Sequence, residues 1–268
     1  MVDKVRTTDR VTGERIAKYL SEGKRFDGRG PLDFRKIIVE KGISKKAEGS
    51  VRVKLGETEV IVGVKLGIGE PYPDSPNKGN FMVTAELLPL SSPRFENGPP
   101  KFEAIELGRV VDRGLRESGF IDFEKLCIKE GEKVWTVFVD VYSINDGGNL
   151  MDAAALGAII ALKIAKLPKY DEEQNKIVFE LTNKPIPITD IIPIPVSVHK
   201  VGDAFLVDPT REEEDLSKTR VTIGISNGII SSVQKSNSES LSIDEMKKVF
   251  EIANEVSKKT LKELQKYF

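Results

Sequence analysis

The stretch DVYSINDGGNLMDAAALGAIIALKIAK, residues 140–166, decides the fold of this chain. Its first part alternates apolar with polar residues, which predicts a β-strand that ends before Asp146-Gly147-Gly148-Asn149. The remainder, Leu150–Lys166, is a run of small and apolar residues that predicts a helix packed tightly on a sheet and closed by Pro168. A strand followed by an apolar helix indicates that sheets and helices share one core.

On the N-terminal side of this stretch, residues 35–66 alternate apolar with charged residues and predict strands with a turn at Gly56-Glu57. FMVTAELLPL, residues 81–90, predicts another strand. The clearest helix of the chain is expected over Lys101–Ser118. Its apolar positions have the 3, 4, 4 spacing of one buried face, namely Ala104, Leu107, Val111 and Leu115.

On the C-terminal side, residues 188–236 predict strands that include a hairpin turn at Asn227-Gly228, and Ser242–Phe268 predicts a long helix. We expect four parts: an N-terminal helical extension (1–22), a first half (23–166), a connector (167–187) and a second half (188–268). Strand clusters followed by helices in both halves predict an α+β fold, with two mixed β-sheet halves and helices packed on one face.

Composition excludes several classes of function. The 268 residues hold 41 Lys and Arg, 42 Asp and Glu, one His and one Cys. Cys127 alone cannot form a disulfide or a cysteine-based zinc site, and His199 lies in a predicted strand, so we expect neither a metal nor a cofactor. No apolar run could span a membrane, and we expect a cytoplasmic protein. With a net charge of −1, any binding of RNA or phosphate requires a local patch.

The first candidate patch is a stripe of three arginines on the helix over 101–118. Arg109, Arg113 and Arg116 are four and three residues apart, so they share one side of the helix, where guanidinium groups suit a phosphodiester backbone. The alternative is a solvated helix in which neighbouring acids pair with these arginines. Those acids are Glu106, Asp112 and Glu117.

Two further segments admit a functional and a structural interpretation. Asp146-Gly147-Gly148-Asn149 precedes a helix, where free N–H groups can bind an anion, but Asn149 is also a good N-cap. The acids of Asp208–Asp215 can bind Mg²⁺ or form a solvated helical turn that begins at Pro209.

Five motifs occur in an order that resembles the RNase PH family. They are KRFDGR at 24–29, Leu88-Pro89, IELGRVVDRGLR at 105–116, DVYSINDGGN at 140–149 and the acids that begin at Asp208. The residues within these motifs are similar to those of the non-catalytic RNase PH-like subunit of the archaeal RNA exosome. This resemblance implies a duplicated RNase PH-type fold and a hexameric ring of three heterodimers with a catalytic RNase PH-like paralogue. It also implies a cap of S1/KH-type proteins and single-stranded RNA as the ligand.

Departures from the family pattern imply that this chain is not an enzyme alone, so no catalytic residue is assigned. Phosphorolytic members carry Thr-Arg or Ser-Arg after the Gly-Gly, whereas this chain has Asn149 and Leu150, and a leucine cannot bind phosphate. Phe102–Ala104 replace the arginine pair of catalytic subunits, and Thr219-Arg220 precede the strand where active members place an aspartate. The alternative is a self-sufficient phosphorolytic 3′–5′ exoribonuclease.

The resemblance places Arg109 and Arg113 at the RNA backbone beside the partner's active site. Arg116 is expected to contribute less, because Asp112 can neutralise it. Arg94, in a loop, is expected to face the central pore of the ring. A third alternative is a purely structural ring member whose arginines are all paired.

Overall fold

The computed structural model describes residues 8–171, 173–174 and 176–268, so residues 1–7 of the predicted extension lie outside it. Its larger sheet has six strands in the order β1-β2-β3-β6-β4, with β5 also paired to β6. The strands are β1 (Ile37–Lys41), β2 (Gly49–Leu55), β3 (Thr58–Gly69), β4 (Asn80–Leu87), β5 (Cys127–Lys129) and β6 (Lys133–Asn145). β4 runs parallel to β6 while the other pairs are antiparallel, so this sheet is mixed.

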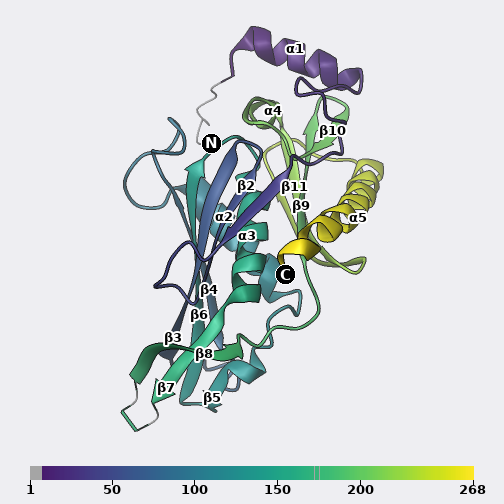
Figure 1. The fold of residues 1–268 in the computed structure, drawn as a ribbon. Coiled ribbons are helices and arrows are strands. Elements are labelled where there is room, and N and C mark those ends of the chain that lie inside the picture. Colours follow the sequence, from purple (N-terminus) through teal and green to yellow (C-terminus); the bar gives the residue numbers. More distant parts are fainter. Residues whose placement is uncertain (1–7, 172, 175) are drawn as a thin grey trace.

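The second sheet has four antiparallel strands in the order β10-β9-β11-β12 (Figure 1). They are β9 (Ile194–Val201), β10 (Ala204–Val207), β11 (Thr219–Ser226) and β12 (Ile229–Ser236). The predicted turn at Asn227-Gly228 joins β11 to β12, and both residues have the positive φ that such a tight turn requires.

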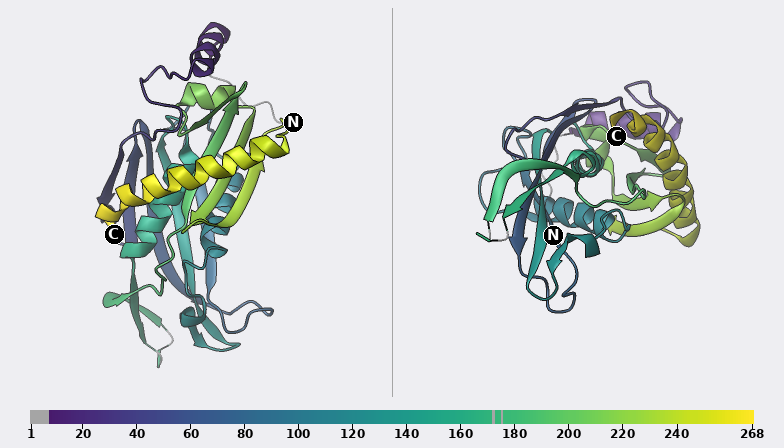
Figure 2. Two further views of the ribbon diagram at one scale, coloured as in Figure 1. Left: turned by 90° about the vertical axis from the view of Figure 1, so that its right-hand side faces the viewer. Right: turned by 60° about the horizontal axis from the view of Figure 1, so that its bottom comes forward.

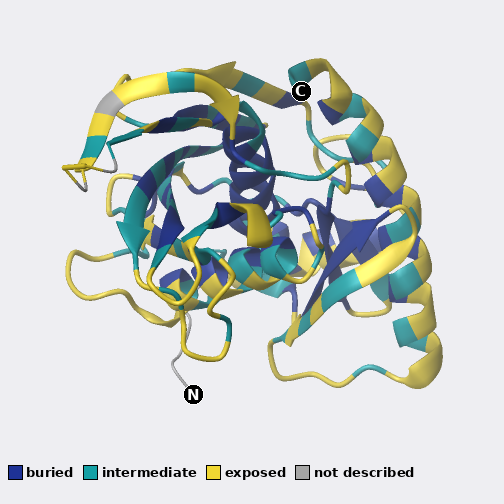
Figure 3. Cartoon of the chain, turned by 90° about the horizontal axis from the view of Figure 1, so that it is seen from below, coloured by how far each residue is buried: buried dark blue, intermediate teal, exposed yellow. Residues whose placement is uncertain are grey.

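Two helices form a layer between the sheets, as Figure 2 shows from two sides. α2 (Phe102–Arg116) contacts β4, β11 and β12, and α3 (Leu150–Ile164) contacts β2, β3, β6 and β9. The first thirteen residues of α3 are all buried, which explains why its sequence is apolar on every side (Figure 3). Gly157 is required there, because a Cβ atom would lie 2.6 Å from Val62 Cγ2. One core therefore joins both halves, and the α+β class is confirmed.

Three further α-helices of the described residues pack around these layers. α5 (Ile243–Leu264) packs on β9 and β11, and Ser242 and Glu245 form the predicted capping box at its start. α1 (Arg10–Ser21) buries Ile16 and Leu20 in a small separate cluster with β9 and β10, close to α4 (Arg211–Leu216). In the described part of the chain, no helix has the length and apolar character that crossing a bilayer requires.

The segment after α3 differs from the expectation. α3 ends at Ile164, and Lys166 already begins β7 (Lys166–Asp171), which pairs with β8 (Lys176–Pro185) as a hairpin. The physical reason is that the N–H of Lys166 donates to the carbonyl of Glu48, the residue before β2, which draws the backbone out of the helix. Pro168 therefore lies within a strand of a two-stranded sheet, where a missing N–H is tolerated, and does not close the helix.

Candidate nucleic-acid interface

The candidate RNA-binding surface is the solvent side of α2. The apolar face of α2 packs on β4 and on the second sheet, and this packing turns Arg109 and Arg113 outwards, so that both are exposed. Residues four apart on a helix lie about 6 Å from each other at their Cβ atoms. Two guanidinium groups at this spacing can bind neighbouring phosphates of one strand.

Arg109 and Arg113 are not neutralised by any residue that the structure describes. Within residues 8–171, 173–174 and 176–268, no hydrogen bond or ion pair holds the Arg109 guanidinium. Arg113 Nη1 donates to the neutral Gln234 Oε1 of β12 at 3.3 Å, and no carboxylate of the described residues pairs with it. Glu106, a predicted partner of Arg109, instead pairs with Arg220 at 2.8 Å.

Arg116 is held differently. Its Nε and Nη2 atoms donate to the two carboxylate oxygens of Asp112 at 3.0 and 2.7 Å, and Nη2 also donates to the carbonyl of Phe81 at 2.7 Å. The hydrogen bonds that Arg116 donates to Asp112 raise the pKa of Arg116 and fix the side chain beside the Phe81 ring. Among the described residues, this is the one ion pair that forms of the three predicted within the stripe.

The turn before α3 has a strained backbone that only its own residues allow. Gly148 has φ +87°, and a Cβ atom there would lie 2.5 Å from the carbonyl carbon of Thr210. Asn149 has φ +58° and occupies the predicted N-cap position, but its side chain does not cap α3. Capping side chains act from an extended backbone. From the left-handed backbone, Asn149 Nδ2 instead donates to Asp152 at 3.1 Å and to Asp208 at 2.9 Å.

A carboxylate of the chain itself lies at the N-terminus of α3. The N–H of Asn149 donates to Glu214 Oε2 at 2.8 Å, and Arg211 pairs with the same oxygen at 3.1 Å. Burial alone would raise the pKa of Glu214, but the charge of Arg211, with smaller effects that include Arg220, lowers it well below its usual range. Glu214 is therefore ionised at neutral pH and occupies the positive end of the helix.

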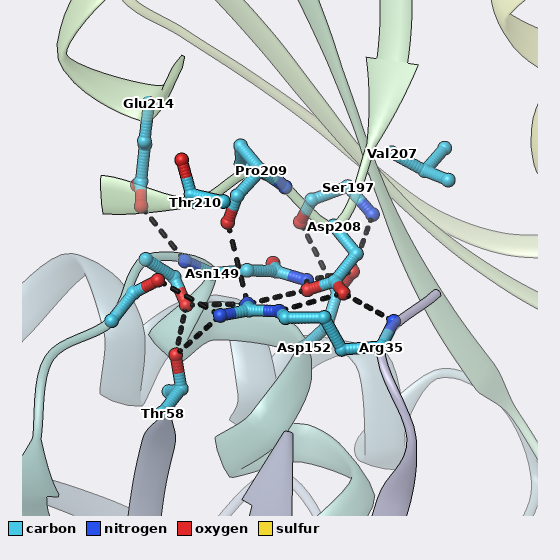
Figure 4. A network of polar contacts seen from close by, with 12 residues as sticks. Arg35, Thr58, Asn149, Asp152, Ser197, Val207, Asp208, Pro209, Thr210 and Glu214 are labelled. Carbon is cyan, nitrogen blue, oxygen red and sulfur yellow. Dashed lines mark hydrogen bonds and ion pairs between the residues drawn. The ribbon is translucent and has the colours of Figure 1, made fainter. Parts of the chain in front are cut away.

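Asp208 is the centre of the polar network in Figure 4. Its carboxylate is fully buried and receives Arg35 Nη2 at 2.6 Å, Arg35 Nε at 2.9 Å and Arg29 Nη1 at 2.9 Å. The same Arg35 guanidinium donates to the carbonyls of Gly147 and Gly148. Arg35 therefore ties the turn before α3 to the acidic segment after β10.

The KRFDGR motif has a structural role that sequence reasoning did not find. The guanidinium of Arg25 is fully buried and forms an ion pair with Glu213 at 2.5 Å, while it also donates to the carbonyls of Val207 and Asp208. The partners lie 188 positions apart in sequence, so no local signal joins them. The available signal for this role was the presence of two arginines in the motif and of an acidic segment far away in sequence that could pair with them.

The acidic segment 208–215 is arranged to bind arginines. Glu214 and Asp215 both pair with Arg211, at 3.1 and 3.0 Å, in the same way that Asp208 and Glu213 bind arginines of the first half. Within the described residues, no group of three His, Cys, Asp or Glu side chains lies close enough to hold a metal ion.

Arg94 is nearly buried, in contrast to the expectation that it faces a pore. Its side chain is 8% exposed, and Nη1 lies 3.6 Å from Asp146 Oδ2 and 3.9 Å from Asp215 Oδ1. These two carboxylates draw the guanidinium inwards, under the loop that carries it.

Two further buried polar residues lie at the start of α3 and on β9. Asp152 accepts hydrogen bonds from the N–H and hydroxyl of Ser197 at 3.1 and 2.7 Å. Burial raises the pKa of Asp152 to about 6, although these donors and Asn149 lower it. His199 is buried on β9, as predicted, with Nδ1 3.2 Å from Ser217 Oγ.

Comparison with known proteins gives matches over almost the whole chain. The model "3' exoribonuclease family, domain 1" matches residues 33–168, and "3' exoribonuclease family, domain 2" matches residues 192–256. The relative "Exosome complex component Rrp42" of Thermococcus onnurineus is 47% identical over 246 residues, which cover 91% of this chain and 90% of the relative. The relative of the same name in Pyrococcus furiosus is 46% identical, with 94% and 93% covered.

Solved structures agree with these matches. A chain of "archaeoglobus fulgidus exosome with RNA bound to the active site" superposes with a TM-score of 0.87 at 42% identity, covering 95% of this chain and 98% of that one. The structure of rice Rrp46 superposes with a TM-score of 0.69 at 16% identity, which supports the fold alone.

Proposed function

Because the chain belongs to the RNase PH family of 3′ exoribonucleases, we propose that it is the non-catalytic ring subunit of an archaeal RNA exosome. In this role it completes and shapes the active site of a catalytic RNase PH-like partner and binds the RNA backbone during 3′–5′ degradation. Membership of the family also confirms the RNase PH-type fold that the sequence predicts. The relatives and the RNA-bound exosome of Archaeoglobus fulgidus supply the context of this proposal.

The observation that carries the non-catalytic role is the N-terminus of α3. The side chain of Leu150 has no group that can bind phosphate, and the backbone N–H of Asn149 already donates to Glu214. A phosphorolytic enzyme must hold inorganic phosphate with positive charge and hydrogen-bond donors at the reacting position. Because this donor is used within the chain, we assign both phosphate binding and the general acid to the partner.

The contact with RNA is assigned to the solvent side of α2. Arg109 and Arg113 are exposed and uncompensated, which suits sequence-independent contacts to phosphate. Arg116 belongs to the same stripe but contributes less, since Asp112 balances its charge. Phosphate contacts of this kind let a degrading complex move along RNA of any sequence.

The proposed assembly is a hexameric ring of three heterodimers with the catalytic RNase PH-like paralogue, covered on one face by S1/KH-type cap proteins. The relatives are themselves exosome components, which supports this arrangement. We place the complex in the cytoplasm and assign no cofactor to this chain.

A degradation assay on single-stranded RNA in the presence of phosphate tests the proposal. It compares this chain alone, the catalytic paralogue alone and the two mixed. We expect no nucleoside diphosphate from this chain alone and strong release from the mixture. Release from this chain alone would instead support the self-sufficient phosphorolytic exoribonuclease, and equal activity of the paralogue with and without this chain would refute the completing role.

A further inference from the structure

A small cavity lies beside the N-terminus of α3. It has a volume of about 50 Å³, and its lining includes Leu150, Met151, Glu214 and three arginines, namely Arg94, Arg211 and Arg220. The arginines come from the loop before α2, from α4 and from β11, so segments of both halves of the chain meet at this point.

The arginines around the cavity have unused hydrogen-bond donors. The side chains of Arg94 and Arg220 are 8% and 9% exposed. Among the described residues, Nε and Nη1 of Arg94 and Nε of Arg220 are buried without an acceptor within hydrogen-bond distance. A buried N–H group without an acceptor is costly, so this concentration of donors marks a position built to face an anion.

The anion now present there is Glu214. Its Oε2 atom accepts the Asn149 N–H at 2.8 Å and pairs with Arg211 at 3.1 Å, while Oε1 lies 4.0 Å from Arg220 Nη1. These are the contacts of an oxyanion at a helix N-terminus: one backbone N–H, the positive end of the helix and guanidinium groups on two sides.

We propose that Glu214 is a built-in anion that occupies this position and excludes inorganic phosphate from it. The inference deepens the proposed function, because it explains the loss of phosphate binding by an occupied site in addition to the missing arginine after Gly148. Five carboxylates lie around the three arginines, so the intact cluster has no surplus positive charge for an external anion. Asp146, Asp215, Glu106 and Glu214 form ion pairs with the arginines, and Glu103 lines the cavity. Removal of the Glu214 charge leaves three ion-paired carboxylates for the three arginines and vacates the position at the Asn149 N–H and the positive end of α3.

The test measures phosphate binding by the full chain carrying Glu214→Ala, which removes both the charge and the volume of the side chain, or Glu214→Gln, which removes the charge alone. The matched control is Glu212→Ala, an exposed acid of the same helix. Melting temperatures are compared in about 50 mM phosphate and in KCl of equal ionic strength. We expect phosphate to raise the melting temperature of Glu214→Ala by about 3 °C or more, to raise that of Glu214→Gln by less, and to leave the parent and Glu212→Ala unchanged.

Glu214→Gln retains an acceptor for the Asn149 N–H, so it keeps the inference testable where Glu214→Ala does not fold. The inference is overturned if a folded Glu214 variant gains no more from phosphate than Glu212→Ala, or if the parent chain binds phosphate as well as the variants do. Neither outcome depends on RNA degradation, so the inference can fail while the non-catalytic role stands.

Discussion

Replacement of Arg109 and Arg113 together by alanine should reduce the salt dependence of RNA binding without loss of ring assembly. Both side chains are exposed and make no ion pair within the described residues, so their removal leaves no buried charge and costs little stability. Each phosphate contact contributes about 0.7 to the slope of log K against log salt for a single strand. Loss of both contacts therefore lowers the slope by about 1.4.

The assay is fluorescence anisotropy of labelled single-stranded RNA on the ring reconstituted with its catalytic partner, over a series of KCl concentrations. Between about 50 and 200 mM salt, a slope difference of 1.4 makes the affinity of the parent ring fall about 7-fold more than that of the variant ring. Arg116→Ala is the matched control from the same stripe, since Asp112 and the Phe81 carbonyl hold its guanidinium. The assignment of RNA contacts to α2 is refuted if a normally assembled double variant keeps the parental slope, or if Arg116→Ala changes the slope as much.

Three further predictions concern the polar network behind this surface. Since burial raises the pKa of Asp152 to about 6, the folded chain binds its proton more tightly than the unfolded chain, and the free energy of unfolding should fall as pH rises from about 4 to about 6. Asp152→Asn should remove about 3 kcal/mol of this pH-dependent loss of stability. If urea unfolding of the variant gives the parental pH profile, the raised pKa of Asp152 is contradicted. Arg25→Ala should lower the free energy of unfolding by about 3–5 kcal/mol, because it leaves Glu213 buried and unpaired. If calorimetry gives a loss below about 1 kcal/mol, water or another cation compensates the Glu213 charge. Gly148→Ala should destabilise the chain by at least about 2 kcal/mol more than Gly131→Ala. Gly131 has a similar positive φ, but the space around it is open, so only the Gly148 variant meets Thr210. Equal melting temperatures of the two variants would rule out this clash.

Elements with a strong local pattern were predictable from sequence. The 3, 4, 4 spacing over Ala104–Leu115 gave α2 to within two residues at each end, and it placed the arginines on the solvent side. The apolar run from Leu150 predicted a helix buried against a sheet, because no side of it could face water. The end of that helix was wrong, since a backbone hydrogen bond to Glu48, far away in sequence, draws Lys166 into a strand.

The polar contacts of the candidate site were only partly predictable. Local spacing identified the Asp112–Arg116 pair, because residues four apart on a helix are neighbours. It could not show that Glu106 pairs with Arg220, since the two residues lie on different elements. The acidic segment 208–215 was recognisable as a cluster. The arginines that bind Asp208 and Glu213, however, come from the opposite end of the chain, and only the tertiary fold brings them together.

The position of α3 between the two sheets has a consequence for the order in which the chain is made. α3 and the first sheet are synthesised before β9 and β11, the strands that cover the other side of the helical layer. The newly made first half therefore carries an apolar helical surface that β9 and β11 do not yet cover. At the turn that starts α3, Arg35 still lacks the Asp208 carboxylate and the Asn149 N–H still lacks its acceptor, Glu214. During synthesis there is thus an interval in which the first half has been made in full but cannot yet bury the second side of its helical layer.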